Sequence, residues 1–191
     1  MSARADILAR VRRRLGGRRR EGLDQARREV DAWLAKRAIG PQPQIRGELL
    51  NAFIDRSEAQ STTIEVADEK SEVPGMVAAW LHAHELPTSA VIWPECADLD
   101  WAGAGIEVRA EGARDGDLVG ITGAFCAIAE TGTLMLCSGP LRAATTSLLP
   151  ETHIALVDFN RIVASMEDAF ALARKELGKL PRAVNFISGP S

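Results

Sequence analysis

The sequence predicts an α/β fold in which helices cover both faces of a parallel or mixed sheet. Two short apolar runs, residues 118–121 and 134–137, contain no charged side chain, and such runs are typical of strands buried on both faces. Beyond residue 41, further apolar runs alternate with helical patterns at the spacing of βαβ units. The length of 191 residues and the 46% hydrophobic content suit one α/β domain with short appendages.

The first 40 residues are predicted to form a helical arm that is separate from this domain. Ser2 is a suitable cap for a first helix, and apolar residues at helical spacing predict a second helix over about 23–38. Gly40 and Pro41 end the second helix, and residues 41–43 are the best linker in the chain. We therefore divide the chain into an N-terminal helical arm, 1–40, and a main domain, 41–191.

The main domain is predicted to alternate helices and strands. Helices are expected where apolar residues recur every three or four positions, and strands where short runs rich in β-branched residues stand between turn signals. In chain order these are helix 47–59, strand 62–66, helix 74–85, strands 90–93, 106–110, 118–121, 134–137 and 154–157, helix 166–177, and strand 184–187.

Composition argues against several functional classes. Three cysteines without C-x-x-C spacing disfavour a disulfide framework, a structural zinc site or an iron–sulfur cluster held by this chain alone. No apolar run is long enough for a membrane span and no export signal is recognisable, so we expect a cytoplasmic protein. His82 and His84 are expected on different faces of a helix, which disfavours a shared metal ion.

Charge is distributed unevenly along the chain. Residues 1–28 hold ten arginines against three acidic residues, a net charge of +7; because the whole chain carries −3, the remainder carries −10. The simplest interpretation of this charge run is a solvated helix face that carries Arg in place of Lys. If the arm has a partner, a basic arm on an acidic domain favours docking to an acidic protein surface, either a partner subunit or a second copy of this chain. Nucleic acid is disfavoured because no aromatic residue alternates with these arginines.

The most informative stretch is 117–154, where small polar residues stand between buried strands. Residues 129–133, with sequence A-E-T-G-T, link two such strands, and small hydroxyls with a glycine let a ligand approach the backbone. The alternative is a tight turn whose threonines satisfy backbone groups. Glu130 must find a donor, ionise at the surface or have its pKa raised, and Arg142 is its natural candidate partner.

The order of motifs in this stretch resembles the lactate-utilization protein C family, also called the LUD domain. The family pattern is a V-T-G-A strand end, an I-A-E-T-G-T turn, S-G-P, an arginine, S-L-L-P and a histidine at the start of the next strand. The matching segments here are Ile121 to Ala124, Ile128 to Thr133, Ser138 to Pro140, Arg142, Ser147 to Pro150, and His153. Segments 2–16 and 183–191 are also similar to family segments, so the resemblance covers nearly the whole chain.

The resemblance implies a Rossmann-like sandwich of the sugar-phosphate isomerase/CoA-transferase-like type. It further implies an accessory or ligand-binding subunit of a cytoplasmic iron–sulfur complex that oxidises L-lactate to pyruvate. The clusters would be carried by partner subunits, and the chain itself would hold no cofactor. The competing hypothesis, an analogy from the fold alone, is a stand-alone enzyme acting on a small acyl, sugar-phosphate or folate-like substrate.

One departure from the family pattern concerns the C-terminus. In the family, S-G-P-S continues into a polar stretch near T-A-D-I-E and a final apolar strand, whereas this sequence stops at Ser191. The resemblance therefore implies a C-terminal strand that is missing here, either because a tail is left out or because the member is truncated.

If a ligand binds, strand ends and adjoining turns are expected to form its site. The predicted ligand-binding residues are Thr122, Gly123, Glu130, Thr131, Gly132, Thr133, Arg142, His153, Ser188 and Gly189. Arg142 would grip a carboxylate or phosphate, while hydroxyls and glycine N–H groups orient it. Glu130 could hold Arg142, anchor the turn, or act as a catalytic base or nucleophile. His153 could be catalytic or simply hydrogen-bonded to backbone at a strand start. No metal site is predicted.

Overall fold

The computed structural model describes residues 3–14, 20–36, 38, 40–41, 45 and 47–190. The chain forms two compact units, residues 1–42 and 43–191. The expected helix cap Ser2 lies outside the described residues, as does the predicted linker 41–43 apart from Pro41.

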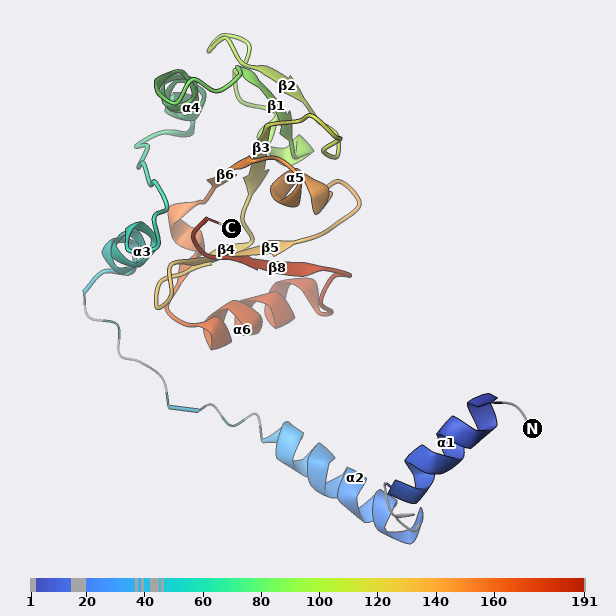
Figure 1. Cartoon of the computed structure of the whole chain (residues 1–191). Helices are drawn as coiled ribbons and strands as arrows, with labels where there is room; N and C mark the ends of the chain where they lie inside the picture. The colour runs from blue at the N-terminus through green and yellow to red at the C-terminus, as the bar shows by residue number, and fades with distance from the viewer. Residues whose placement is uncertain are drawn as a thin grey trace. The chain divides into compact units, whose positions relative to one another are not determined.

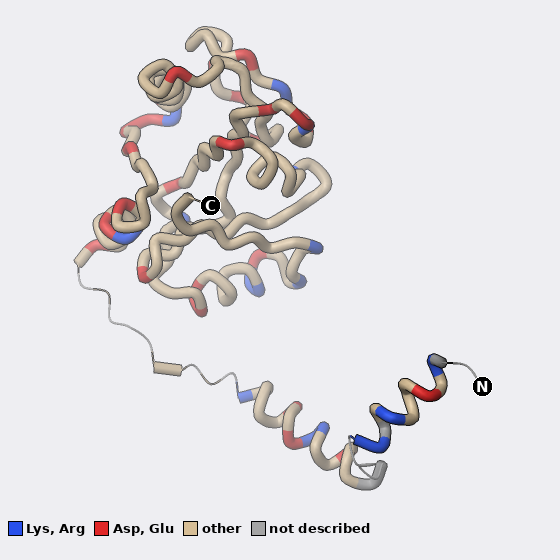
Figure 2. The backbone as a smooth tube through the Cα atoms, in the orientation of Figure 1, with Lys and Arg blue, Asp and Glu red and all other residues tan. Residues whose placement is uncertain are grey.

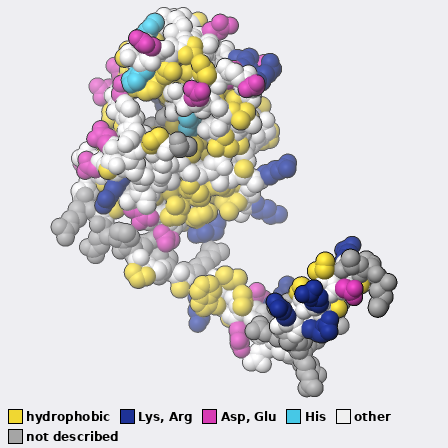
Figure 3. All heavy atoms as spheres, in the orientation of Figure 1, with side chains coloured by type: hydrophobic (Ala, Val, Ile, Leu, Met, Phe, Trp, Pro, Cys, Tyr) yellow, Lys and Arg dark blue, Asp and Glu magenta, His cyan; other side chains and the backbone are white. Residues whose placement is uncertain are grey.

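The first unit contains two helices, α1 (Ala3–Arg14) and α2 (Arg20–Ala35). The second helix ends three residues before the predicted position, ahead of the Gly40-Pro41 stop. Basic residues recur along both helices (Figure 2). Their large apolar side chains are exposed (Figure 3), namely Ile7, Leu8, Val11, Leu23, Val30, Trp33 and Leu34.

The second unit confirms the predicted α/β fold and contains a four-stranded parallel sheet (Figure 1). Its strands are β1 (Ser89–Ile92), β2 (Glu107–Arg109), β3 (Val119–Gly123) and β6 (Thr152–Leu156), in the spatial order β2-β1-β3-β6. One face packs against α4 (Val73–Ala83) through Val77 and Leu81. The other face meets the short helix α5 (Thr145–Leu148). Helices therefore cover both faces of this sheet.

A second, mixed sheet follows, with the order β7-β4-β5-β8. Its strands are β4 (Cys126–Ile128), β5 (Thr133–Cys137), β7 (Ile162–Val163) and β8 (Val184–Ile187). Successive β4 side chains alternate between two cores, as a pleated strand requires. Cys126 and Ile128 pack with α6 (Met166–Leu177), while Ala127 packs with Phe53 of α3 (Leu49–Glu58).

The two sheets share one nearly continuous run of chain, because only Ala124 and Phe125 separate β3 from β4. The Ala124 N–H donates to Leu156 O of the first sheet at 3.1 Å, and the Phe125 N–H donates to Met135 O of the second sheet at 2.8 Å. The carboxyl edge of the first sheet therefore abuts the second sheet.

One predicted strand is wrong. Residues 62–66 form no β-ladder; they are extended chain in which Ile64 packs against the core around Phe53. The β-branched residues there favour an extended backbone but cannot supply a neighbouring strand. The predictions also missed the short elements β4, β7 and α5 and the three-residue helices η1 (Lys70–Glu72), η2 (Pro94–Cys96) and η3 (Phe159–Arg161), because elements of two to four residues carry little periodicity.

Two further properties concern the described part of the chain. None of the helices there has both the length and the apolar character of a membrane span. No group of three or more His, Cys, Asp or Glu side chains among the described residues is arranged to hold a metal ion.

Candidate ligand site at the carboxyl edge of the parallel sheet

The order of the parallel strands defines a topological switch point. From β1 the chain passes to β2 on one side and then returns to β3 on the other side. In open α/β sheets, the connections from two such neighbouring strands leave in opposite directions and open a crevice at their carboxyl ends. Here the crevice is bordered by the residues that follow β1 and β3.

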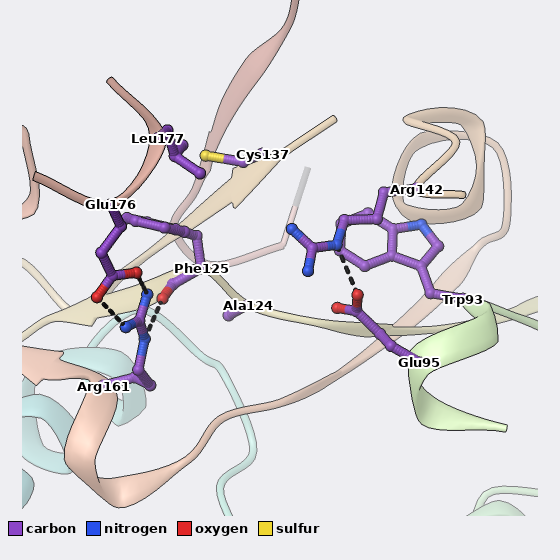
Figure 4. A pocket seen from close by; sticks show the side chains of 9 residues that line it. All are labelled: Trp93, Glu95, Ala124, Phe125, Cys137, Arg142, Arg161, Glu176 and Leu177. Atoms are coloured by element: carbon purple, nitrogen blue, oxygen red, sulfur yellow. Dashed lines mark hydrogen bonds and ion pairs between the residues drawn. The ribbon is translucent and has the colours of Figure 1, made fainter. Parts of the chain in front are cut away.

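A cavity of about 350 Å³ lies at this position (Figure 4). Residues after β1, between β3 and β4, at the end of β5, before α5, in η3 and at the end of α6 all contribute to its wall. They are Trp93, Glu95, Ala124, Phe125, Cys137, Arg142, Arg161, Glu176 and Leu177. This volume is at the small end of the range for small-molecule sites, and the wall combines aromatic surface with two arginine–glutamate pairs.

The first pair is formed by Arg142 and Glu95. The Arg142 Nε donates to Glu95 Oε2 at 2.6 Å, and both side chains are about 40% exposed. The Trp93 indole Nε1 donates to Ala143 O at 3.0 Å and so anchors the segment that carries Arg142. Gly123 leaves room for the carboxylate, since a Cβ there would lie 3.0 Å from Glu95 Oε1.

The second pair, Arg161 with Glu176, faces it across the cavity (Figure 4). Two parallel hydrogen bonds of 2.7 and 3.0 Å join the guanidinium to the carboxylate. The Arg161 Nε donates to Phe125 O at 2.8 Å, and the guanidinium lies 4.7 Å from the centre of the Phe125 ring. All three nitrogens of Arg161 are therefore engaged within the protein, which makes it a wall of the cavity.

The thiol that lines the cavity is not activated. Burial raises the pKa of Cys137, and nearby Cys96 has its pKa raised to about 11, first by burial and then by the Glu95 charge. Both thiols are therefore protonated at neutral pH, and the cavity offers no thiolate nucleophile.

The structure distributes the predicted ligand-binding residues over three places. Arg142 lines the cavity, and Gly123 lies beside Glu95 of its wall. Thr122 and His153 lie on the first sheet, on the face toward α5. The turn 130–133 joins Ser188 and Gly189 beside α3.

Thr122 and His153 form a pair on adjacent strands, with Thr122 buried and His153 partly buried. Thr122 Oγ1 lies 2.8 Å from His153 Nε2. Burial lowers the pKa of His153 to about 4, so the imidazole is neutral at physiological pH. Among the described residues, the hydrogen bond shown for the His153 ring is thus to a side-chain hydroxyl and not to the backbone. The Thr122 side chain is inaccessible to solvent.

The turn 130–133 connects β4 to β5 as an antiparallel hairpin and packs on α3. The Gln60 amide donates to Thr131 O at 2.7 Å, and the hydroxyl of Thr131 donates to that of Thr133, which also contacts Ser188. Gly132 has φ +62°, and a Cβ there would lie 2.6 Å from Ser57 N. The tight-turn alternative therefore describes this segment, and α3 occupies the side on which a ligand would approach.

The predicted partnership of Glu130 with Arg142 is wrong. Glu130 Oε1 accepts the Met166 N–H at 3.0 Å, and Arg142 binds Glu95 instead. Met166 is the first residue of α6, where backbone N–H groups lack partners within the helix and the helix dipole favours a negative charge. Of the roles considered for Glu130, the structure shows an anchor that ties the hairpin turn to the helix.

This anchor leads to a stability prediction. We expect Glu130→Ala to lower the free energy of unfolding by about 1–2 kcal/mol, because the Met166 N–H loses a charged acceptor. Glu130→Gln keeps an oxygen acceptor and should lose less than half of that. Urea unfolding followed by circular dichroism measures both values. Glu167→Ala removes an exposed charge from the same helix turn and serves as the control; an equal loss in all three variants would contradict a specific anchor.

Sequence reasoning missed eight of the nine cavity residues, all except Arg142. The missed residues include the indole and the charged groups of Trp93, Glu95, Arg161 and Glu176. The ion pairs join positions 47 and 15 residues apart, so no local spacing marks them. One signal was available for Trp93 and Glu95, since they lie at and just beyond the carboxyl end of the predicted strand 90–93, where switch-point ligands bind.

Fold and cavity together define an α/β protein with a small polar cavity at the carboxyl edge of a parallel sheet. The chain belongs to the LUD domain family, which it matches over residues 50–191. The resemblance stated from the motifs is therefore confirmed.

Similar proteins include two named Lactate utilization protein C. The one from Shouchella clausii is 33% identical over 144 residues, covering 72% of this chain and 62% of that protein. The one from Geobacillus sp. (strain WCH70) is 41% identical over 76 residues, covering 38% of this chain and 32% of that protein. The matched stretches thus span less than two thirds of these relatives' length.

The fold is also similar to a crystal structure of a DUF162 family protein from Deinococcus radiodurans. The TM-score is 0.60 at 25% sequence identity, over 78% of this chain and 91% of that one.

Proposed function

We propose that this chain takes part in lactate utilization as the ligand-binding subunit of a cytoplasmic iron–sulfur complex that oxidises L-lactate to pyruvate. The names of its relatives support the pathway. Partner subunits would carry the clusters, and the basic arm with its exposed Val30, Trp33 and Leu34 would dock on such a partner or on a second copy.

The observation that carries the proposal is the cavity at the switch point with Arg142 in its wall. A guanidinium binds carboxylates through parallel hydrogen bonds, and the lactate pathway handles small carboxylates. The alternative is a stand-alone enzyme acting on a small acyl, sugar-phosphate or folate-like substrate. Glu130, the carboxylate considered as its nucleophile, does not support it, because Glu130 binds the start of α6.

Gene deletion with complementation tests the role. We expect the deletion strain to grow poorly on L-lactate and normally on glucose, and the wild-type gene to restore growth on L-lactate. Arg142→Ala should fail to restore it at equal protein level, because the cavity loses its carboxylate-binding group. Arg114→Ala removes an arginine outside the cavity wall and should restore growth fully.

Unimpaired growth of the deletion strain on L-lactate would refute the pathway assignment. Full complementation by Arg142→Ala would refute the cavity as the functional site. Purification of the wild-type chain without any iron–sulfur protein would remove the complex from the proposal while leaving the pathway.

A further inference from the structure

The two arginines of the cavity differ in what they leave free. Arg161 uses Nε, Nη1 and Nη2 within the protein. For Arg142, the hydrogen bond that the structure shows among the described residues is the one from Nε. Figure 4 shows both terminal nitrogens of Arg142 directed into the cavity. The two terminal nitrogens of Arg142 can therefore donate two parallel hydrogen bonds to one carboxylate.

Glu95 likewise uses only one of its two carboxylate oxygens within the protein. Its Oε2 accepts from Arg142, whereas Oε1 lies beside Gly123 and accepts no hydrogen bond from the described residues. An ionised carboxylate oxygen only accepts, so it favours a ligand atom that donates and disfavours one that also accepts. Donor and acceptor are thus joined on one ion pair at the cavity wall.

From this arrangement we infer that the cavity selects a short carboxylate that carries a hydrogen-bond donor on the adjacent carbon, as a 2-hydroxy acid does. The inference rests on the proposed function, in which this cavity is the ligand site. The ligand carboxylate binds the Arg142 Nη groups, and its hydroxyl donates to Glu95 Oε1. Glu95 is then the specificity-determining residue, because a 2-oxo acid of the same size places an acceptor against its carboxylate.

The discrimination has a predictable size. Both side chains of the pair are about 40% exposed, so an unmatched group can still be hydrated. We therefore expect L-lactate to bind about tenfold more tightly than pyruvate, well below the discrimination of fully buried polar sites.

Calorimetric titration of the whole purified chain with L-lactate, pyruvate and L-alanine tests the inference. In the wild type, L-lactate should bind more tightly than pyruvate by about tenfold. Glu95→Gln offers an amide that both donates and accepts, so the ratio should fall to near one. Glu111→Gln changes an exposed carboxylate outside the cavity wall and should leave the ratio unchanged. Thermal melts of both variants check that they are folded.

L-alanine separates two sources of the same chemistry. Tighter binding of L-alanine than of L-lactate supports the same contacts with Arg142 and Glu95, with an amino acid as the ligand. Equal binding of L-lactate and pyruvate, no binding of either, or a preference that survives Glu95→Gln would overturn the inference. Growth and binding separate the two claims: a required gene whose product binds no lactate removes only this inference, and lactate binding with a dispensable gene removes the pathway role.

Discussion

Replacing Gly120 with alanine is expected to destabilise the main domain by roughly 3 kcal/mol, at the upper end of the usual cost of overpacking. A Cβ at this position in β3 would lie 2.0 Å from Thr146 O and 2.9 Å from Pro150 Cγ. The first contact is with backbone, so no side-chain rotation relieves it. The variant can fold only if α5 moves away from the sheet.

Thermal unfolding measures this effect, and a protein of this size should lose roughly 6–12 °C in Tm for such a change. Gly75→Ala is the matched control. Gly75 is exposed in α4 with no atom within 4 Å of the added Cβ, so the alanine should be neutral or stabilise the helix by up to about 1 kcal/mol. A Tm of Gly120→Ala within error of the wild type would show that α5 is not seated on β3.

The second large effect is a pH dependence of stability that originates at His153. Burial lowers its pKa to about 4 in the folded protein, whereas an unfolded histidine titrates near 6.5. Between these values the unfolded chain binds a proton that the folded chain excludes. Stability from this residue is therefore fully present above about pH 6.5 and is lost as the pH falls toward 4, in total about 3 kcal/mol.

Urea unfolding at pH 7 and pH 4 isolates this contribution when the wild type is compared with His153→Gln. Glutamine retains an N–H near Thr122 but takes up no proton in this range, so the wild type should lose about 3 kcal/mol more than the variant on acidification. His82→Gln, an exposed change on α4, should behave like the wild type. Parallel losses in wild type and His153→Gln would contradict a neutral imidazole in the folded protein.

Sequence reasoning located the longer elements because their patterns are local. The helix 166–177 and the strand 184–187 were predicted with the observed bounds, and the helix carries a Ser165 and Asp168 capping box at its start. The passage from β3 to β4 was missed, since Gly123-Ala124-Phe125 contains no turn signal that separates two strands. A change of sheet within one apolar run depends on which strands lie alongside, and sequence spacing does not contain that information.

Some features of the candidate site could likewise be predicted from local sequence, and others could not. Gly123 and Arg142 were identified from motif order, and the structure places Arg142 in the cavity wall and Gly123 beside its Glu95. The expectation that Glu130 would meet Arg142 failed because the hairpin carries Glu130 to the start of α6. Glu95 follows β1, whereas Arg142 lies between β5 and α5, so their contact joins distant segments that no short motif encodes.

The pair of residues between β3 and β4 has a consequence for cooperativity. The adjacent N–H groups of Ala124 and Phe125 donate to different sheets. Moving one sheet away from the other would therefore break one of these two hydrogen bonds. The two sheets should therefore unfold as a single cooperative unit, without an intermediate in which one sheet is unfolded and the other intact. Residues from both sheets form the cavity wall, so a bound ligand would raise the stability of the whole domain by mass action. Backbone amides in both sheets would then exchange their hydrogens more slowly, and to the same degree.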